Sequence, residues 1–380
     1  MSLDQRFPSF AAMERKARRR VPKFAMDYLS GGIGREVGLA RNRQVLDQIQ
    51  LLPRYIMDEV PPETSTHFLG RYYSAPFGVA PLGFSGLMWP QAAEIMARAA
   101  KAHEVPFALS TFATTDLERA RILAGEMAWF QLYTPNDPEV AETLIQRVED
   151  AGYETLLVTV DIPAPTRRER DMANGLNLPP RLTLKTFWEI ATRPSWALET
   201  LVKGSPEFKN LTPLVPPGTK LADAAAYFFD MTVSHISAEG LKRLRDRWPG
   251  RLIVKGILNA DDAVLCKDIG ADGLVLSNHG GRQLDAAPSS LEVLAQIRQV
   301  VGQDYPLIID GGLRSGLDVA RAIASGADFV LLGRAFIYAV AAIGQAGGNH
   351  AIHVLKEELA STMGQLGCPA LADLPAFLRP

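Results

Sequence analysis

The stretch RLIVKGILNADDAVLCKDIGADGLVLSN, residues 251–278, has the pattern of one complete strand–helix–strand unit. Its two apolar runs, at 251–256 and 273–278, lack the polar alternation of a strand with one face in water, so we expect strands buried on both faces. The segment between them starts at Asn259, a favourable N-cap, and continues with helical spacing. Buried strands joined by a helix are typical of a parallel sheet.

The same pattern continues in both directions along the chain. Amphipathic segments separate most of the apolar runs, with Ser315 as a second favourable N-cap and Gly152 and Gly326 as favourable helix stops. Alternating strands and helices of this kind predict a TIM (β/α)8 barrel, and an open doubly wound sheet is the alternative because periodicity does not reveal closure. The apolar runs lie at 77–83, 106–111, 128–133, 155–161, 251–256, 273–278, 306–311 and 328–333.

Three segments lie outside this pattern. Residues 1–75 form an N-terminal extension with a helix predicted at 9–20, and residues 345–380 form a helical tail. The third segment is a long insertion at 171–230, after the fourth predicted strand, where a connection usually has about 2–6 residues. We expect a single domain over residues 1–380, because barrels reach this size once such segments are added.

Composition and charge exclude several classes of protein. The 380 residues are 47% hydrophobic and 22% charged, which excludes a disordered chain, and the net charge of -2 creates no field that would attract nucleic acid. Cys266 and Cys368 are far apart and belong to no CxxC or Cys/His cluster. We therefore expect neither a disulfide framework nor a zinc or other metal site.

The N-terminal region does not have the pattern of a secretory signal. The segment VPKFAMDYLSGG, at 21–32, contains Lys23 and Asp27 where a signal peptide requires an apolar run. No stretch approaches the ~18 uninterrupted apolar residues of a membrane span. We therefore expect a cytoplasmic protein whose contact with a membrane, if there is one, is peripheral.

The string SNHGGRQLD, residues 277–285, follows the sixth apolar run and would lie at the carboxyl rim of a barrel, where catalytic side chains gather. His279 and Arg282 are three residues apart on this glycine-rich turn, so a titratable base and a permanent cation can face one ligand. A carboxylate bound by Arg282 would have its 2-carbon near His279. For an isolated NHG sequence, a helix-capping turn with a solvated arginine is the alternative.

With this string, the chain resembles the FMN-dependent L-2-hydroxy acid oxidases and dehydrogenases, which include glycolate oxidase, L-lactate dehydrogenase and (S)-mandelate dehydrogenase. The resemblance covers nearly the whole chain, from VPKFAMDYLSGG through FQLY, VTVD and VKG to DGGLRSG and GADFVLLGR. These motifs occur in the family's order, one at each predicted strand end. The resemblance implies an FMN cofactor, a small 2-hydroxy acid substrate and a homotetramer.

The resemblance also implies the catalytic residues. His279 would be the base that takes a proton from the substrate, and Asp161 would orient His279 and stabilise its cationic form. A strand-end residue that caps the next segment is the alternative for Asp161. Whether the reaction proceeds by hydride or by carbanion transfer is left open.

Six residues are expected to bind the substrate: four through polar groups, and Gly83 and Phe112 through the room they leave for its side chain. Arg282 and Arg168 would bind its carboxylate, because a guanidinium group can donate two parallel hydrogen bonds. Arg168 belongs to the string APTRRERDMANG, which is also compatible with a solvated face. Tyr28 and Tyr133 would donate hydrogen bonds to the substrate, with Tyr133 counted among the catalytic residues. Buried aromatic residues with satisfied hydroxyl groups are the alternative for both tyrosines.

Lys255, at the end of the fifth run, is a cation at the rim of a buried strand, where it requires an anionic partner. The resemblance places Lys255 beside the N1–O2 edge of the flavin, where it would stabilise negative charge during catalysis. A structural ion pair with Asp272 or Asp310 is the alternative.

The FMN phosphate is expected after the seventh and eighth strands, where glycines let backbone N–H groups approach a phosphate and arginines neutralise it. The residues of this phosphate site are Asp310, Gly311, Gly312, Arg314, Gly333 and Arg334. The resemblance adds contacts to the flavin ring, for which ordinary buried positions are the alternative, from Pro81, Leu82, Gly83, Ser110, Gln131, Thr159 and Ser277.

Two positions at the expected substrate site resemble the dehydrogenase branch of the family. Gly83 stands where the short-chain oxidases have alanine, and Phe112 stands where glycolate oxidase has tryptophan. Both changes alter the room for the substrate side chain. We therefore expect a lactate-like or mandelate-like acid as substrate in preference to glycolate.

The insertion combines aromatic and basic residues at 182–204, a composition that suits a segment lying in a membrane interface. An ordered lid packed on the barrel is the alternative. We expect a peripheral enzyme on the inner face of the cytoplasmic membrane that passes electrons to a quinone. A soluble oxidase that uses oxygen and forms hydrogen peroxide is the alternative, whereas a catalytically silent sensor would require the loss of a catalytic group, and none is lost.

Overall fold

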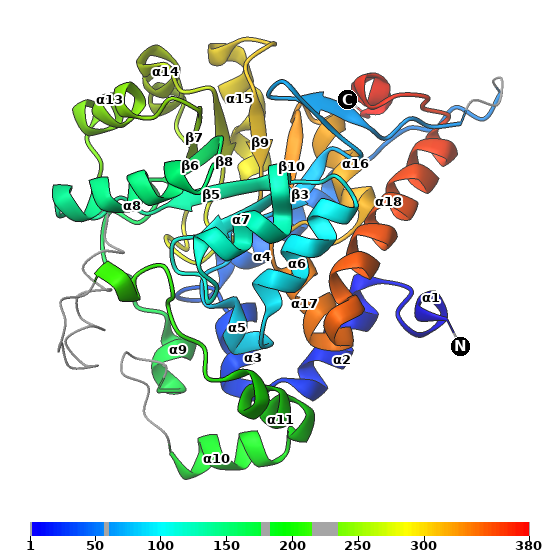
Figure 1. Cartoon of the computed structure of the whole chain (residues 1–380). Coiled ribbons are helices and arrows are strands. Elements are labelled where there is room, and N and C mark those ends of the chain that lie inside the picture. Colours follow the sequence, from blue (N-terminus) through cyan, green and yellow to red (C-terminus); the bar gives the residue numbers. More distant parts are fainter. Residues whose placement is uncertain (1, 57–60, 176–182, 215–234, 380) are drawn as a thin grey trace.

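Parallel strands close into a barrel in the computed structural model, which describes residues 2–56, 61–175, 183–214 and 235–379 (Figure 1). Each apolar run contains one barrel strand, and the last strand pairs with the first, Val330 beside Phe77. The predicted TIM barrel is therefore confirmed and the open sheet is wrong. In order, the barrel strands are β3 (Phe77–Val79), β4 (Phe107–Ser110), β5 (Ala128–Leu132), β6 (Thr155–Thr159), β7 (Arg251–Ile257), β8 (Gly273–Leu276), β9 (Leu307–Ile309) and β10 (Phe329–Leu332).

An outer helix follows each barrel strand, and local signals set its ends. Asn259 accepts a hydrogen bond from the backbone N–H of Asp261, and Ser315 caps the next predicted helix in the same way. Gly152 and Gly326 follow helix ends with φ of +81° and +104°, a region that favours glycine. The outer helices are α6 (Ala92–Ala102), α7 (Leu117–Ala124), α8 (Pro138–Asp150), α13 (Ala238–Arg247), α14 (Ala260–Ile269), α15 (Ser290–Val301), α16 (Gly316–Ala324) and α17 (Arg334–Ile343).

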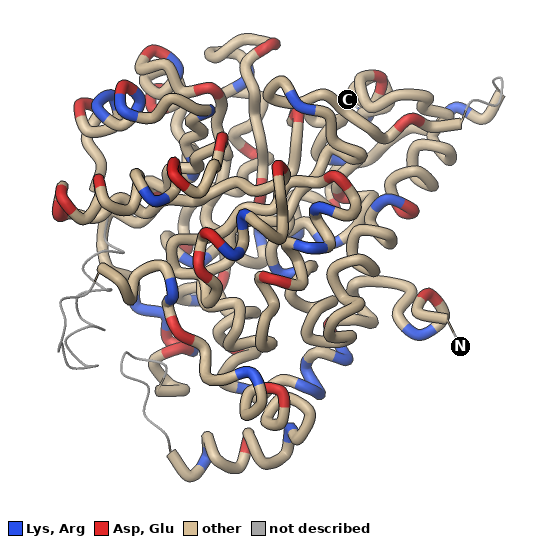
Figure 2. Tube along the Cα trace, in the orientation of Figure 1, with Lys and Arg blue, Asp and Glu red and all other residues tan. Residues whose placement is uncertain are grey.

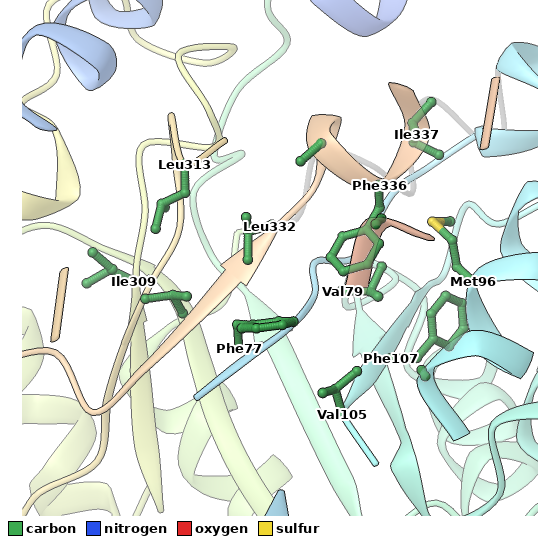
Figure 3. Packing of buried hydrophobic residues seen from close by; sticks show 14 of the residues in the cluster. Phe77, Val79, Met96, Val105, Phe107, Ile309, Leu313, Leu332, Phe336 and Ile337 are labelled. Atoms are coloured by element: carbon green, nitrogen blue, oxygen red, sulfur yellow. The ribbon is translucent and has the colours of Figure 1, made fainter. Parts of the chain in front are cut away.

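The apolar core has two layers. Between the strands and the helices, Phe77 and Phe107 pack with side chains such as Met96 and Phe336 (Figure 3). Inside the barrel, a second layer that includes Phe329 packs against the hairpin of β1 (Thr66–Phe68) and β2 (Arg71–Tyr73). The ring of Phe68 stacks on that of Phe329 at 4.9 Å between centroids, so the hairpin closes one end of the barrel.

The segments outside the barrel pattern pack on its surface. Helix α2 (Phe10–Arg20), at the predicted position, contacts α17, and the tail helix α18 (Gly347–Leu366) contacts α6, α16 and α17. Of the predicted insertion, residues 176–182 and 215–230 lie outside the described residues. The remaining helices are α1 (Leu3–Arg6), α3 (Lys23–Ser30), α4 (Val37–Gln48), α5 (Ser85–Met88), α9 (Glu169–Ala173), α10 (Leu184–Ala191) and α11 (Pro194–Lys203), with 3-10 turns at Gly125–Met127, Thr212–Leu214, Gly344–Ala346 and Leu371–Phe377.

Candidate active site

A cavity of about 370 Å³ lies at the carboxyl end of the barrel strands. Its volume is within the ~300–1,000 Å³ typical of small-molecule sites. Loops after the strands bring together side chains that are far apart in the sequence. The predicted site residues that line it are Tyr28, Pro81, Leu82, Gly83, Phe112, Gln131, Tyr133, Thr159, Arg168, Lys255, His279, Arg282, Asp310, Gly311, Gly312, Arg314, Gly333 and Arg334.

Three predicted residues, Ser110, Asp161 and Ser277, lie behind this lining. Ser277 Oγ accepts hydrogen bonds from Lys255 Nζ and from the backbone N–H of His279, both at 3.0 Å. Ser110 Oγ accepts one from the backbone N–H of Phe112 at 3.2 Å. The flavin contacts predicted for Ser110 and Ser277 stay predictions. In the structure, both side chains hold neighbouring site residues by hydrogen bonds.

His279, on the cavity lining, pairs with Asp161 behind it, with 2.8 Å between Nδ1 and Oδ1. Burial lowers the pKa of the His279 imidazole, and the opposing effect of Asp161 does not fully offset it. The imidazole is therefore neutral near pH 7 and can act as a base. Burial would raise the pKa of the Asp161 carboxyl, but His279 and Lys255 outweigh it and the pKa is lowered. Gly256, in the VKG motif, makes room for this pair, because a Cβ there would lie 2.6 Å from Asp161 Cβ.

Tyr133 lies on the cavity side of His279, with 3.4 Å between its hydroxyl oxygen and Nε2. Burial raises the pKa of the Tyr133 phenol far above the neutral range. The hydroxyl therefore stays protonated and can donate a hydrogen bond to a ligand oxygen beside Nε2. The ring of Phe112 packs edge-on against that of Tyr133 at 5.3 Å between centroids.

Lys255 Nζ lies 3.2 Å from Asp310 Oδ2 and 3.8 Å from Asp161 Oδ2. Burial alone would lower the pKa of the Lys255 ammonium group, but the two carboxylates outweigh it and the pKa is raised. Lys255 is therefore a buried cation. Of the two ion pairs considered from the sequence, only that with Asp310 forms, because Asp272 pairs with Arg245 at 2.7 Å.

Arg282 lines the cavity, as His279 does, and its Nη1 donates to the backbone carbonyls of Tyr28 and Gly31 at 2.6 and 2.9 Å. Burial, with a further contribution from Arg168, lowers the pKa of Arg282 to about 10. Arg168 also lines the cavity, and its Nε is buried with no hydrogen-bond partner among the described residues. Two neighbouring guanidinium groups with spare donors fit a ligand carboxylate.

The expected phosphate end contains two more arginines, the buried Arg334 and the partly buried Arg314. Burial lowers the pKa of Arg334 to about 9, with further contributions from Arg314 and Arg282. Burial also lowers the pKa of Arg314. Gly311 and Gly312 have φ of +96° and +86°, in the region that favours glycine, so the backbone beside these cations is shaped as the DGG motif predicts.

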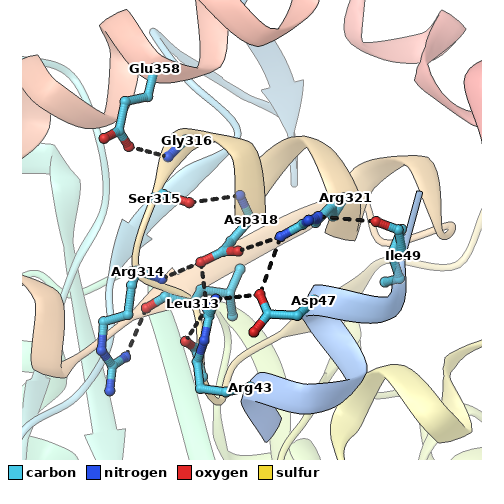
Figure 4. Close-up of polar contacts among 11 residues, drawn as sticks. Arg43, Asp47, Ile49, Leu313, Arg314, Ser315, Gly316, Asp318, Arg321 and Glu358 are labelled. Atoms are coloured by element: carbon cyan, nitrogen blue, oxygen red, sulfur yellow. Dashed lines mark hydrogen bonds and ion pairs between the residues drawn. The ribbon is translucent and has the colours of Figure 1, made fainter. Parts of the chain in front are cut away.

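A hydrogen-bond network fixes this phosphate loop from the N-terminal extension (Figure 4). Arg43 on α4 donates to the backbone carbonyl of Gly312 at 2.9 Å and pairs with Asp318 at 2.6 Å. Asp318 in turn accepts from the backbone N–H of Arg314 at 2.7 Å. The loop is therefore held in place by the protein itself.

The residues present fit FMN from both ends. Arg314 and Arg334 repel each other, so an anion such as a phosphate group bound between them would stabilise both positive charges. At the other end, Gln131 Nε2 donates to Thr159 Oγ1 at 2.9 Å beside Lys255, which supplies polar groups for a flavin ring. Buried oxygens of Asp161 and Asp310 have no hydrogen-bond partner among the described residues, as expected of a polar site that binds a ligand.

Sequence reasoning missed several cavity residues. Asp171 lies 3.9 Å from Arg282, and burial raises the pKa of its carboxyl. Phe208, from the insertion, packs on Phe84 at 4.8 Å and on Phe112 at 5.6 Å between ring centroids, forming an apolar wall. Asp171 stands within the string APTRRERDMANG and could have been considered with Arg168, whereas no sequence signal marked Phe208.

Gly83 faces this apolar wall. A Cβ at Gly83 would lie 3.3 Å from Phe112 Cβ, a tight contact that the ring of Phe112 would have to relieve by moving. The two positions at which the family resemblance predicts a difference from the oxidases are thus neighbours at the cavity.

Comparison with known proteins agrees with this geometry. The model of the family described as FMN-dependent dehydrogenase matches residues 17–379. The chain belongs to the FMN-dependent dehydrogenase family. The predicted family resemblance is therefore confirmed, and so is FMN as the cofactor of the family to which the chain belongs.

Relatives within the FMN-dependent dehydrogenase family include (S)-mandelate dehydrogenase of Pseudomonas putida, 38% identical over 95% of this chain and 91% of that protein. L-lactate dehydrogenase of Caulobacter vibrioides is also 38% identical, over 94% of both proteins. Among solved structures, monotopic membrane protein (S)-mandelate dehydrogenase is similar with a TM-score of 0.92 and 36% identity, covering 98% of each chain. A mandelate oxidase is similar with a TM-score of 0.80 and 33% identity, again over 98% of each chain.

The pair of His279 and Asp161 predicts how activity depends on pH. If neutral His279 is the base, as the family resemblance predicts, activity should fall as pH drops through its lowered pKa. Asp161 raises the pKa of His279, so in Asp161→Asn this loss of activity on the acidic side of the pH profile, the acid limb, should move to lower pH. The maximal rate should fall by about 10²–10⁴-fold, because the imidazolium loses its carboxylate partner. The rate of FMN reduction by L-lactate or (S)-mandelate across acidic pH is the measurement.

Asp328→Asn is the matched control, because it removes a carboxylate paired with Arg298 at 2.7 Å outside the residues that line the cavity. It should leave the acid limb in place. An Asp161→Asn limb that stays unchanged or moves to higher pH would contradict the assignment.

Proposed function

We propose that this protein oxidises an L-2-hydroxy acid to the 2-oxo acid. The observation that carries the proposal is that His279, paired with Asp161 at 2.8 Å, lines the same cavity as the guanidinium groups of Arg282 and Arg168. FMN, when bound, supplies the ring that accepts the two electrons of the oxidation. The residues of this chain bind and orient the acid and hold the proton.

The role of each residue follows from its position. Arg282 and Arg168 bind the substrate carboxylate, which fixes the 2-carbon and its hydroxyl group beside His279 Nε2. Nε2 accepts a proton from the substrate, and Asp161 stabilises the resulting imidazolium through Nδ1. Tyr133 stays protonated and donates a hydrogen bond to a substrate oxygen.

Lys255 and the apolar wall complete the site. Lys255 keeps its positive charge and lowers the free energy of negative charge that develops beside it. Phe84, Phe112 and Phe208 form an apolar wall, which supports a lactate-like or mandelate-like side chain on the substrate.

The test is anaerobic bleaching of the yellow holoenzyme by a panel of L-2-hydroxy acids and their D-enantiomers. We expect bleaching by apolar L-acids such as L-lactate or (S)-mandelate. His279→Ala should retain FMN but be reduced slower by at least about 10²-fold, because the base is lost while the phosphate site stays intact. Near-native reduction of His279→Ala, or no bleaching of the native enzyme by any acid of the panel, would overturn the proposal.

We propose further that the enzyme docks on the inner face of the cytoplasmic membrane and delivers electrons to a quinone. Helices α10 and α11 expose an apolar face whose members are Leu184, Phe187, Trp188, Leu198, Leu201 and Val202. Their other side is anchored: Trp196 is buried, packs on Phe24 and donates to the backbone carbonyl of Leu87 at 3.1 Å. Both alternatives considered from the sequence thus have support: the insertion packs on the barrel, as an ordered lid would, and it also presents an apolar surface, as a membrane-interface segment would.

A helix that contacts α11 carries exposed basic residues, which an anionic lipid surface would attract. Helix α2, with the exposed side chains of Arg15, Lys16 and Arg19, contacts α11 (Figure 2). None of the helices in the described ranges is long and apolar enough to cross a bilayer. A peripheral mode of attachment agrees with these features. The homotetramer stays a prediction.

The membrane proposal predicts that the native enzyme sediments with anionic phospholipid vesicles. Replacing Trp188 and Leu201 together with serine should release it and slow electron transfer to a vesicle-bound quinone, because exposed apolar area is lost. Anaerobic bleaching should be unchanged. Ile122→Ser, which removes an exposed apolar side chain on α7, is the matched control and should still sediment.

A soluble oxidase is the competing function. It would be favoured if the native enzyme stays in the supernatant and oxygen reoxidises it as fast as quinone does. Formation of hydrogen peroxide in step with substrate consumption would identify it.

A further inference from the structure

The backbone of His279 lies in the left-handed region, with φ of +57°. This conformation is uncommon for a residue with a side chain, and it persists only where surrounding contacts enforce it. The conformation directs the imidazole toward Asp161 and Tyr133, so whatever enforces it also places the base. Ser277 is one such contact, since its Oγ accepts from the backbone N–H of His279.

Asn278 is the second and more constrained contact. Its Oδ1 accepts from the backbone N–H of Gly281 at 3.0 Å, and its Nδ2 donates to the carbonyl of Pro288 at 3.1 Å. The remaining donor and acceptor of the amide are taken by Asn42, with Nδ2 to Oδ1 distances of 2.8 and 2.9 Å. An amide has two donor and two acceptor positions, so the side chain of Asn278 is fully satisfied and its orientation is fixed.

Asn42 lies on α4 in the N-terminal extension, 236 residues away from Asn278 in the sequence. The two amides are 1% and 4% exposed, so water does not substitute for the hydrogen bonds between them. Without Asn42, one donor and one acceptor of Asn278 would be buried without partners, which favours rotation of the amide. Rotation would release the turn that carries His279.

Asn42 also contacts the phosphate loop. A Cβ at Gly311 would lie 3.3 Å from Asn42 Nδ2, and one at Gly312 would lie 2.7 Å from the Asn42 carbonyl oxygen. The next residue, Arg43, donates to the carbonyl of Gly312 (Figure 4). Helix α4 therefore lies between the turn with the base and the loop expected to bind phosphate.

We propose that Asn42 is a positioning residue for catalysis, which holds His279 in its left-handed conformation through the reciprocal amide pair with Asn278. The proposal rests on the function proposed above, in which His279 is the base. Asn42 does not line the cavity, and its effect on His279 passes through Asn278. It also gives the N-terminal extension a role in the reaction.

The experiment compares Asn42→Ala with the native holoenzyme in single-turnover, anaerobic reduction by the best acid of the panel. We expect reduction to slow by on the order of 100-fold, as for a misplacement of about 1 Å. The substrate dissociation constant should change by less than about 3-fold, because the arginines remain. Tyr153→Phe is the control: it removes a buried hydrogen bond of 2.8 Å to Leu117 and should reduce at the native rate.

A double-mutant cycle separates positioning from a general loss of stability. If Asn42 acts through Asn278, the variant with both residues changed to Ala should be reduced no more slowly than Asn278→Ala alone. Additive losses of rate would overturn the proposal. A crystal structure of Asn42→Ala holoenzyme gives a readout besides activity: we expect the φ angle of His279 to leave the left-handed region or its imidazole to shift from Asp161.

Asn42→Asp provides a decisive variant should Asn42→Ala fail to retain FMN. The introduced carboxyl can replace both hydrogen bonds when protonated, but only one when ionised. Burial raises the pKa of such a carboxyl, so reduction should acquire a loss at rising pH that the native enzyme lacks. A pH profile identical to the native one would overturn the proposal. A native enzyme that no acid bleaches would instead refute the proposed function itself.

Discussion

Burial of positive charge at the carboxyl end of the barrel is the constraint on which the rest of the structure depends. Lys255, Arg282, Arg314 and Arg334 all border one cavity, and burial together with mutual repulsion lowers the pKa values of Arg282 and Arg334. Charges of one sign, removed from water, are stable only with counter-charges nearby. Asp161 and Asp310 pair with Lys255, and Asp171 lies 3.9 Å from Arg282. Among the described residues, no carboxylate forms an ion pair with Arg314 or Arg334, which suits the phosphate group expected there.

The N-terminal extension follows from the same constraint. The carbonyl oxygen of Gly31 accepts from both Arg282 and Arg334, each at 2.9 Å, so two arginines of the cavity hold the end of α3 on the barrel. One helix further along, Asn42 and Arg43 reach the turn with His279 and the phosphate loop. The extension is thus a part of the site that connects its two ends.

Much of this arrangement could be predicted from the sequence, because it depends on local patterns. Unbroken apolar runs predicted every barrel strand, and side chains at their carboxyl ends converge for geometric reasons. The pairing of His279 with Asp161 was expected from the family resemblance and is present in the structure at 2.8 Å. The exchange of hydrogen bonds between Asn42 and Asn278 could not be predicted, since neither spacing nor composition marks a contact across 236 residues.

In the insertion, too, the contacts between distant parts of the chain could not be predicted from the sequence. Trp188 and Trp196 stand eight positions apart in one amphipathic stretch, yet the first is 71% exposed and the second only 5%. What separates them is tertiary packing on Phe24, which periodicity does not contain. Phe208, in the same insertion, reaches the cavity wall for the same reason.

Titration of the apoprotein with FMN and with riboflavin tests the central claim most directly, because the two ligands differ only in the phosphate group. If Arg314 and Arg334 form a buried anion site, FMN should bind on the order of 100-fold or more tightly than riboflavin, as expected for charge-assisted hydrogen bonds. Arg334→Ala should remove most of that difference. Equal affinities of the native apoprotein for the two ligands would contradict the account.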